Sequence, residues 1–171
     1  TGYTGAGGFE NGSTFAANGW TAVNSTSNAW FLGAASTPFA GSRSAYISND
    51  NGTTWGYSTT TTSTSHFYRD VTVPAGEEAI NLSFQWKGSG ESGWDRLLIY
   101  IAPTTLNPEV NVPVSSSNVL TGATLVYTQA SYAQATYTNG VVSLPTSLAG
   151  TSFRLIFTWQ NDALFGTSPG A

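Results

Sequence analysis

The chain has 171 residues, with 9 acidic and 5 basic side chains, a net charge of −4, and no cysteine or methionine. The few cations are scattered, which argues against nucleic-acid binding and against a basic membrane-binding surface, because both need clustered Lys and Arg. Without cysteine the chain has no disulfide, thiol nucleophile or thiolate-bound metal. No stretch approaches the ~20 apolar residues of a membrane span, so membrane insertion is not expected.

Short segments in which apolar and polar residues alternate follow one another along the chain, as in β-strands. The expected strands are 43–48, 66–73, 80–86, 96–102, 123–128 and 152–159. Clusters of Gly, Pro, Asn and Ser separate them, and the helix formers Lys, Glu and Met are scarce or absent. The pattern predicts an all-β fold, an antiparallel β-sandwich of two sheets, in one domain over residues 1–171. Residues 1–8 contain four glycines and are expected to be flexible or a linker.

The sequence contains few combinations of residues that could form a catalytic site. The one histidine, His66, lies in a strand pattern, no Ser occupies a Gly-x-Ser-x-Gly turn, and we interpret His66 as a hydrogen-bonding residue near a sheet edge. A glycosidase needs two carboxylates across the sugar. Glu91 and Asp95, in the Gly-rich segment 88–95, are the nearest such pair. We expect them to tie a hairpin by accepting backbone N–H bonds or to contact a ligand, and the chain is predicted not to be an enzyme.

Aromatic residues make up 13% of the chain, and in a sandwich most of them fill the core. Four tryptophans in strand-like patterns are expected to be buried: Trp20, Trp30, Trp86 and Trp159. Trp55 and Trp94 instead lie in loop-like segments. They are therefore the candidates for stacking on a ligand, together with Glu91 and Asp95 beside Trp94.

Oxygen-bearing side chains gather in Ser48–Gly52, at the end of an expected strand. Calcium prefers such ligands, but the segment lacks the spacing of a helix-loop-helix calcium loop, and a plain Asn-Gly turn explains it equally well. A zinc site is not expected in a chain with no cysteine and one histidine.

An ordered set of motifs resembles the cleaved-adhesin or choice-of-anchor J domains of secreted bacterial proteins, which are relatives of the MAM domain. The matching pieces are Phe9-Glu10 with Gly19-Trp20, the glycine-led strand 41–50, the segment 82–87 with Glu91 and Trp94-Asp95, and the closing segment 157–162 with Gly166 and Pro169. The resemblance implies a jelly-roll fold and a secreted or cell-surface role in adhesion or ligand binding.

The same resemblance implies a structural calcium ion held by Glu10, Asn49 and Asp50. It also implies a further strand after the Gly-x-x-Pro segment, which this sequence lacks after residue 171, so we expect an exposed sheet edge able to take a strand from an adjacent chain or segment. The function expected is a non-catalytic, calcium-stabilised module that binds a glycan or a surface protein. The alternatives are a structural spacer or filament subunit and, less expected, a glycoside-hydrolase-like domain.

Overall fold

The structure is a computed structural model that describes residues 5–114 and 120–171. Strands dominate the described residues, and the helical segments are the short 3-10 turns η1 (Gly5–Gly8), η2 (Ala16–Asn18) and η3 (Thr146–Leu148). In chain order the strands are β1 (Thr21–Val23), β2 (Ala29–Gly33), β3 (Ser44–Ser48), β4 (Ser63–Thr72), β5 (Ile80–Ser89), β6 (Arg96–Ala102), β7 (Thr124–Thr128), β8 (Ala133–Leu144) and β9 (Ser152–Asn161). None of the described helices is long and apolar enough to cross a membrane.

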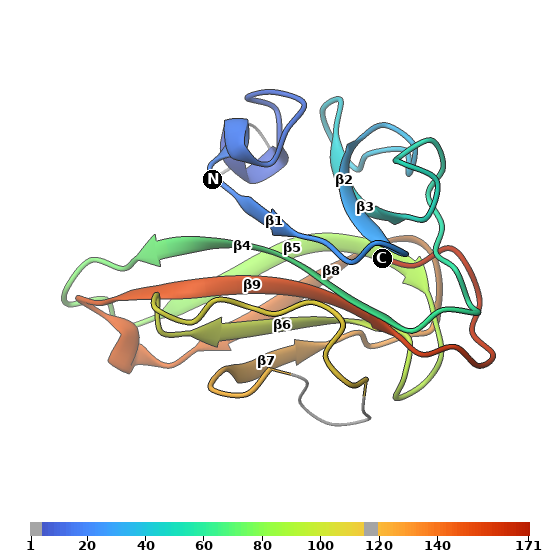
Figure 1. The fold of residues 1–171 in the computed structure, drawn as a ribbon. Coiled ribbons are helices and arrows are strands. Elements are labelled where there is room, and N and C mark those ends of the chain that lie inside the picture. Colours follow the sequence, from blue (N-terminus) through green and yellow to red (C-terminus); the bar gives the residue numbers. More distant parts are fainter. Residues whose placement is uncertain (1–4, 115–119) are drawn as a thin grey trace.

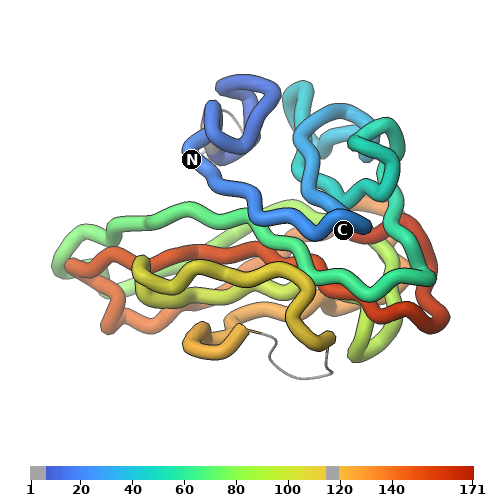
Figure 2. Tube along the Cα trace, viewed as in Figure 1, coloured from blue at the N-terminus to red at the C-terminus, as the bar shows by residue number. Residues whose placement is uncertain are grey.

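The strands pair into one large sheet and two small ones, all antiparallel. The large sheet has the order β1-β4-β9-β6-β7, and the small sheets are the pairs β2-β3 and β5-β8. The β5-β8 pair lies behind the large sheet, and the β2-β3 pair stands at one end of the sandwich (Figures 1 and 2). This confirms the predicted all-β antiparallel sandwich of jelly-roll type.

The core lies between these layers and is rich in aromatic rings. Phe67 on β4 and Phe157 on β9 are stacked with ring centroids 4.8 Å apart, and Trp20, Trp30 and Phe84 contact this pair edge-on. Such contacts add to the hydrophobic stabilisation from the buried area. The four tryptophans expected in the core are all buried, which confirms that prediction.

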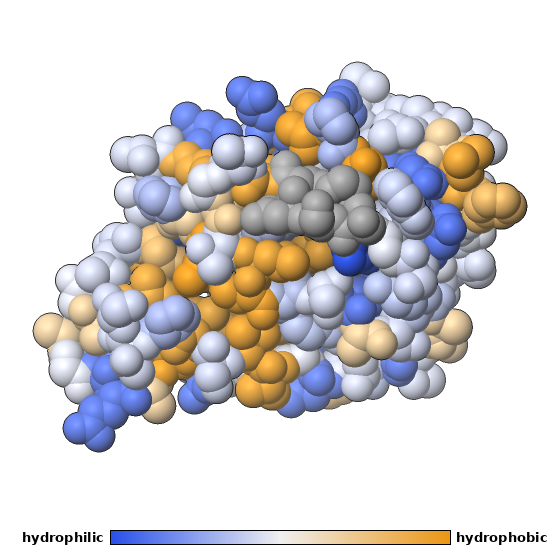
Figure 3. Space-filling view, turned by 90° about the horizontal axis from the view of Figure 1, so that it is seen from below, coloured by the Kyte–Doolittle hydropathy of each residue, from blue (hydrophilic) through white to orange (hydrophobic). Residues whose placement is uncertain are grey.

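A second apolar cluster covers the outer face of the large sheet. Leu98, Tyr100 and Ile156 on β6 and β9 pack there against residues of the segment after β6, Leu106 and Val112 among them. Seen from below (Figure 3), apolar residues gather in the middle of the surface, and polar residues border them. Because both of its faces are covered, β6 is buried along its whole length.

All six predicted strands exist, and β6 matches its predicted range, 96–102, at both ends. β8, with 12 residues, was missed because its Asn139-Gly140 dipeptide is typical of a turn. The structure shows why glycine stands inside this strand. A Cβ at residue 140 would lie 2.3 Å from Cζ of Phe84 on the paired strand, so the glycine leaves room for that ring. Of the segment 1–8, residues 1–4 lie outside the described part.

Candidate functional site: a carboxylate cluster between two loops

The loop between β5 and β6 brings Glu91 and Asp95 together. An isolated bridge joins them: the N–H of Glu91 donates to the carbonyl of Asp95 (3.1 Å), and the N–H of Asp95 donates to the carbonyl of Glu91 (3.0 Å). Gly90 is required for this closure because a Cβ there would lie 2.0 Å from the Asp95 carbonyl oxygen. The loop is therefore tied by backbone hydrogen bonds rather than by the two carboxylates to which the prediction gave this role, and these carboxylates stay close to each other.

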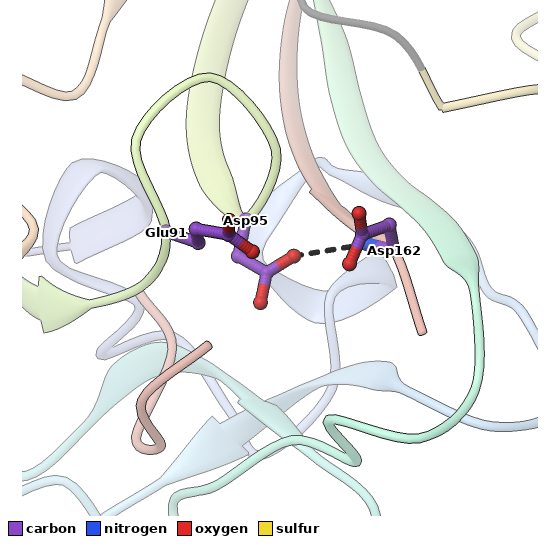
Figure 4. A group of neighbouring side chains, drawn as sticks. All are labelled: Glu91, Asp95 and Asp162. Carbon is purple, nitrogen blue, oxygen red and sulfur yellow. Dashed lines mark hydrogen bonds between the residues drawn. The ribbon is translucent and has the colours of Figure 1, made fainter. Parts of the chain in front are cut away.

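A third carboxylate, Asp162, joins this pair from the end of β9. Carboxylate oxygens of Glu91, Asp95 and Asp162 all lie within 4.8 Å of one another (Figure 4). The sequence analysis did not select Asp162, which is 67 residues from Asp95. The closing motif 157–162 ends at this residue, and strand pairing is what brings it to the cluster, because β6 and β9 are neighbours with Arg96 opposite Gln160.

Asp95 is the buried centre of the cluster, with 0% of its surface exposed. Its Oδ2 accepts a hydrogen bond from the Tyr57 hydroxyl (2.7 Å), and its Oδ1 accepts one from the backbone N–H of Asp162 (2.9 Å). Burial, reinforced by the neighbouring charges of Asp162 and Glu91, raises the pKa of Asp95 to about 6. Burial and the hydrogen bond to Asp95 also raise the pKa of Tyr57.

Glu91 contributes a buried carboxylate oxygen to the cluster. Its Oε2 is buried and has no hydrogen-bond partner among the described residues. A buried carboxylate oxygen without a donor is costly. Three carboxylates at this distance repel one another, and a cation would relieve both problems, since oxygen ligands of this kind suit calcium.

A buried network of hydrogen bonds holds the end of β9 next to the cluster. Asn161, the last residue of β9, is fully buried and accepts hydrogen bonds from Asn28 Nδ2 (2.8 Å) and from the Ser63 hydroxyl. Its own Nδ2 donates to the carbonyls of Ser58 (3.1 Å) and Thr61 (2.8 Å). These bonds fix the end of β9 and so set the position of the next residue, Asp162.

Exposed apolar side chains lie next to the cluster on two loops. Trp94, which precedes Asp95, is 38% exposed, and Leu164 and Phe165, which follow Asp162, are 64% and 82% exposed. The second loop is held close to the cluster: the N–H of Leu164 donates to Asp162 Oδ1 (2.8 Å), and a Cβ on Gly166 would lie 2.2 Å from Asp95 Oδ2. Trp94 is therefore an exposed ring beside carboxylates, as predicted.

Trp55, the other candidate for stacking, is in a different environment. It is half-buried, its indole Nε1–H donates to the Gly170 carbonyl (3.0 Å), and the Lys87 ammonium lies 4.6 Å from its ring centroid. One face of this ring is thus occupied by a cation of the protein itself. Trp55 lines an apolar groove that Trp94 does not line.

The residues proposed for calcium, Glu10, Asn49 and Asp50, lie in two loops. Glu10 accepts hydrogen bonds from the N–H groups of Ser42 and Arg43 (both 2.9 Å) and from the Ser42 hydroxyl, which lower its pKa.

The Asp50 carboxylate accepts hydrogen bonds within its own turn. It accepts hydrogen bonds from the Thr54 hydroxyl (2.6 Å), the Ser48 hydroxyl (2.7 Å) and the Thr54 N–H (2.9 Å), which lower its pKa to about 2. Asn49 is exposed. The carboxylate oxygens of Glu10 and Asp50 thus already have protein donors, and the assignment of calcium to these three residues stays a prediction.

His66 is a hydrogen-bonding residue of the interior. Its Nδ1 pairs with the Thr158 hydroxyl (2.9 Å) and its Nε2 with the Glu109 carbonyl (3.0 Å), and burial lowers its pKa to about 4. The strand β4 is second in its sheet, next to the short edge strand β1, which agrees with the expected position near a sheet edge. Among the hydrogen bonds of the described residues, neither ring nitrogen of His66 pairs with a serine hydroxyl or a carboxylate.

Comparisons with known proteins identify no family for this chain. No protein-family model matches the sequence, and no curated protein matches it. Among solved structures the chain is similar to the carbohydrate-binding module TmCBM61, described in complex with β-1,4-galactotriose. The two share 9% identity over 84% of this chain and 79% of that chain, with a TM-score of 0.46. At this level of similarity the ligand of that module does not indicate the ligand of this chain.

Proposed function

We propose that this chain is a non-catalytic glycan-binding module, secreted or displayed at a cell surface, whose binding face is formed by the loops 90–95 and 162–166. The observation that carries the proposal is the pair of exposed rings, Trp94 and Phe165, on two loops that also hold the carboxylates of Glu91 and Asp162. Rings beside convergent polar groups are the recurring composition of ligand-binding sites.

The chemistry of the site fits a neutral sugar. An exposed aromatic ring can cover the apolar C–H face of a pyranose, while carboxylate oxygens accept hydrogen bonds from its hydroxyl groups. Carboxylates repel like charges, so a sulfated or uronic-acid glycan would be disfavoured at this site. The net charge of −4 acts in the same direction.

A catalytic role for Glu91 and Asp95 fits the geometry poorly. A catalytic carboxylate must touch its substrate, but Asp95 has no exposed surface and both of its oxygens accept hydrogen bonds from protein groups. The raised pKa of Asp95 follows from that burial. We therefore assign Asp95 to the support of the site.

We further propose that one calcium ion binds at Glu91, Asp95 and Asp162. What favours this position is Glu91 Oε2, which is buried without a hydrogen-bond partner among the described residues, whereas every carboxylate oxygen of Glu10 and Asp50 has a protein donor. The ion would offset part of the negative charge of the cluster and fix the two loops that carry the rings. The adhesin-type role suggested by the sequence motifs stays part of this proposal, as one setting for such a module.

Binding is tested on a panel of neutral and acidic oligosaccharides that includes β-1,4-galactotriose. Trp94→Ala and Phe165→Ala are each expected to weaken the binding of a neutral glycan at least tenfold, or about 1.4 kcal/mol, without changing the melting temperature. Phe39→Ala is the matched control, because Phe39 is also exposed (50%) but lines the groove instead. A blank panel, or equal losses in all three variants, would overturn the proposal.

The calcium site is tested by melting curves with calcium and with a chelator. A metal that binds only the folded protein adds about 2.7 kcal/mol of stability at one hundred times its dissociation constant. Asp162→Asn is expected to abolish the stabilisation, and Asp50→Asn to retain it. The opposite result would place the ion at Glu10, Asn49 and Asp50, and no shift in the wild type would remove calcium from both positions.

A further inference from the structure

The strand β8 is the longest in the described part of the chain, and one of its two edges is unpaired there. Among the described residues β8 pairs only with β5, which lies beside it behind the large sheet (Figure 1). No other described segment makes a backbone hydrogen bond to the residues Thr138–Leu144. The edge of β8 that faces away from β5 therefore carries N–H and carbonyl groups with which another strand can pair.

The regular part of this edge is the segment Thr138–Leu144. Over these seven residues the pairing with β5 is continuous, and before Thr138 the register shifts. In the irregular part the Gln134 side-chain amide donates to the Thr136 carbonyl (2.6 Å), and Pro145 follows the strand at its other end. The segment Thr138–Leu144 thus offers about 23 Å of regular strand to a partner.

This segment lacks the devices that usually protect a free edge. Its sequence, Thr-Asn-Gly-Val-Val-Ser-Leu, contains no charged residue and no proline. Natural edge strands are commonly protected by lysine, proline, a bulge or a very short length. The end strands of the large sheet are protected in this way, because β1 has only three residues and the pairing of β7 with β6 contains a register shift. The unprotected edge of β8 therefore favours a partner strand in solution.

An apolar side chain is exposed at the centre of the segment. The even-numbered residues face the core, as the burial of Gly140 and Leu144 shows, and the odd-numbered residues face solvent. Val141 is the central residue of the seven and is 59% exposed. A strand paired with this edge would cover Val141, because side chains directly opposite on neighbouring strands contact each other.

The lack of charge favours a second copy of this chain as the partner. In a two-fold dimer β8 runs antiparallel to its own copy, so a charge near the axis would meet the same charge. The segment Thr138–Leu144 has none. With the axis at Val141, residue 138 is opposite 144 of the second copy, 139 opposite 143 and 140 opposite 142. This register pairs the whole segment and places core-facing residues opposite core-facing residues.

We propose that two copies of this chain pair through the edges of β8, antiparallel and with the two-fold axis at Val141. The two β5-β8 pairs then form one sheet of four strands, and the two Val141 side chains contact each other across the axis. One pair of strands buries less than the ~1,600 Å² of a standard interface, so the dissociation constant is expected to be on the order of 10 µM. This inference does not depend on the proposed glycan site, since Trp94 and Phe165 lie outside β8.

The register is tested by cross-linking, because the chain has no cysteine. Val141→Cys introduces a single thiol, so a disulfide must join two molecules. Residues directly opposite on antiparallel strands have Cα atoms about 4.5–5.5 Å apart, which a disulfide can bridge. The matched control is Ser83→Cys, since Ser83 is exposed and lies opposite Val141 on β5. In the dimer the two Ser83 residues are three strand spacings apart, about 14 Å, which a disulfide cannot bridge.

Under mild oxidation Val141→Cys is expected to form the covalent dimer at least tenfold faster than Ser83→Cys. Equal rates for the two variants would overturn the proposed register.

Dimerisation itself is measured by sedimentation of the whole chain from about 1 µM to 1 mM. Val141→Lys places two ammonium groups opposite each other at the axis and is expected to weaken the dimer at least tenfold. Ser83→Lys adds the same charge on the neighbouring strand and is expected to dimerise as the wild type does. If Val141→Lys fails to fold, the wild-type sedimentation and the cysteine comparison decide. A wild type that stays monomeric at 1 mM, assemblies larger than a dimer, or equal effects of the two lysines would overturn the proposal.

Discussion

Replacing Asn161 by alanine tests whether buried polar groups, rather than apolar packing alone, fix the end of β9. In the wild type, the Asn161 side chain accepts from Asn28 and Ser63 and donates to the carbonyls of Ser58 and Thr61. Alanine leaves the two donors, which belong to the fully buried residues Asn28 and Ser63, and three carbonyls, those of Ser58, Thr61 and Asp162, without this partner. A buried group that loses its partner costs about 1–3 kcal/mol, so the variant should lose about 3–5 kcal/mol, allowing for the bonds that Asn28 retains.

The matched control is Asn139→Ala on β8. Asn139 also lies in a strand, but it is exposed and its amide oxygen accepts one hydrogen bond from Gln85 (3.3 Å). Its loss should change stability by no more than about 0.5 kcal/mol. Urea unfolding followed by tryptophan fluorescence gives both values, and in a chain of this length the predicted loss corresponds to a melting temperature lower by about 6–20 °C.

The refuting result is a small difference between these variants. If Asn161→Ala and Asn139→Ala differ by less than about 1 kcal/mol, the network does not determine stability in the way that its burial implies. If Asn161→Ala loses much stability but still binds glycan normally under conditions in which it is folded, the network stabilises the fold without positioning Asp162.

Three further predictions test individual contacts. Burial raises the pKa of Asp95 from about 4 in the unfolded chain to about 6, so the stability that this group contributes is complete below pH 4 and is lost as the pH rises through 6. In the presence of a chelator, Asp95→Asn should therefore make the free energy of unfolding less dependent on pH over this range. Gly140→Ala should cost about 1–3 kcal/mol in the same urea assay, because its Cβ would clash with Phe84, and an unchanged midpoint would contradict the packing. Arg154→Lys should cost about 2 kcal/mol, because lysine cannot reproduce the two bonds to Asp70 (2.8 and 3.1 Å), and stability within 0.5 kcal/mol of the wild type would refute that role.

The alternation of side chains was enough to predict most of the sandwich. The best match was β6, where a continuous apolar run rather than an alternation follows Arg96, and where loop residues bound the segment Arg96–Ala102 on both sides. It failed for β8, because the signal of Asn139-Gly140 is local and the reason for the glycine lies on another strand, in the ring of Phe84. A pattern within one segment carries no information about what the neighbouring strand requires of it.

The site shows the same division between local and long-range information. Glu91, Trp94 and Asp95 belong to one short loop, so the sequence could present them together. Asp162 reaches them only through the pairing of β6 with β9, which the sequence does not state. The role of Trp55 was likewise decided by distant groups, since Lys87 covers its ring and Gly170 accepts its N–H.

The segment after β9 connects the carboxylate cluster to the groove that Trp55 lines. It begins at Asp162 in the carboxylate cluster, and at Gly166 it passes so close to Asp95 and Tyr57 that no side chain would fit. It ends in the groove, where the carbonyls of Pro169 and Ala171 accept bonds from β5 and β3. A ligand that orders one end of this segment therefore restrains the other end through only a few residues of backbone.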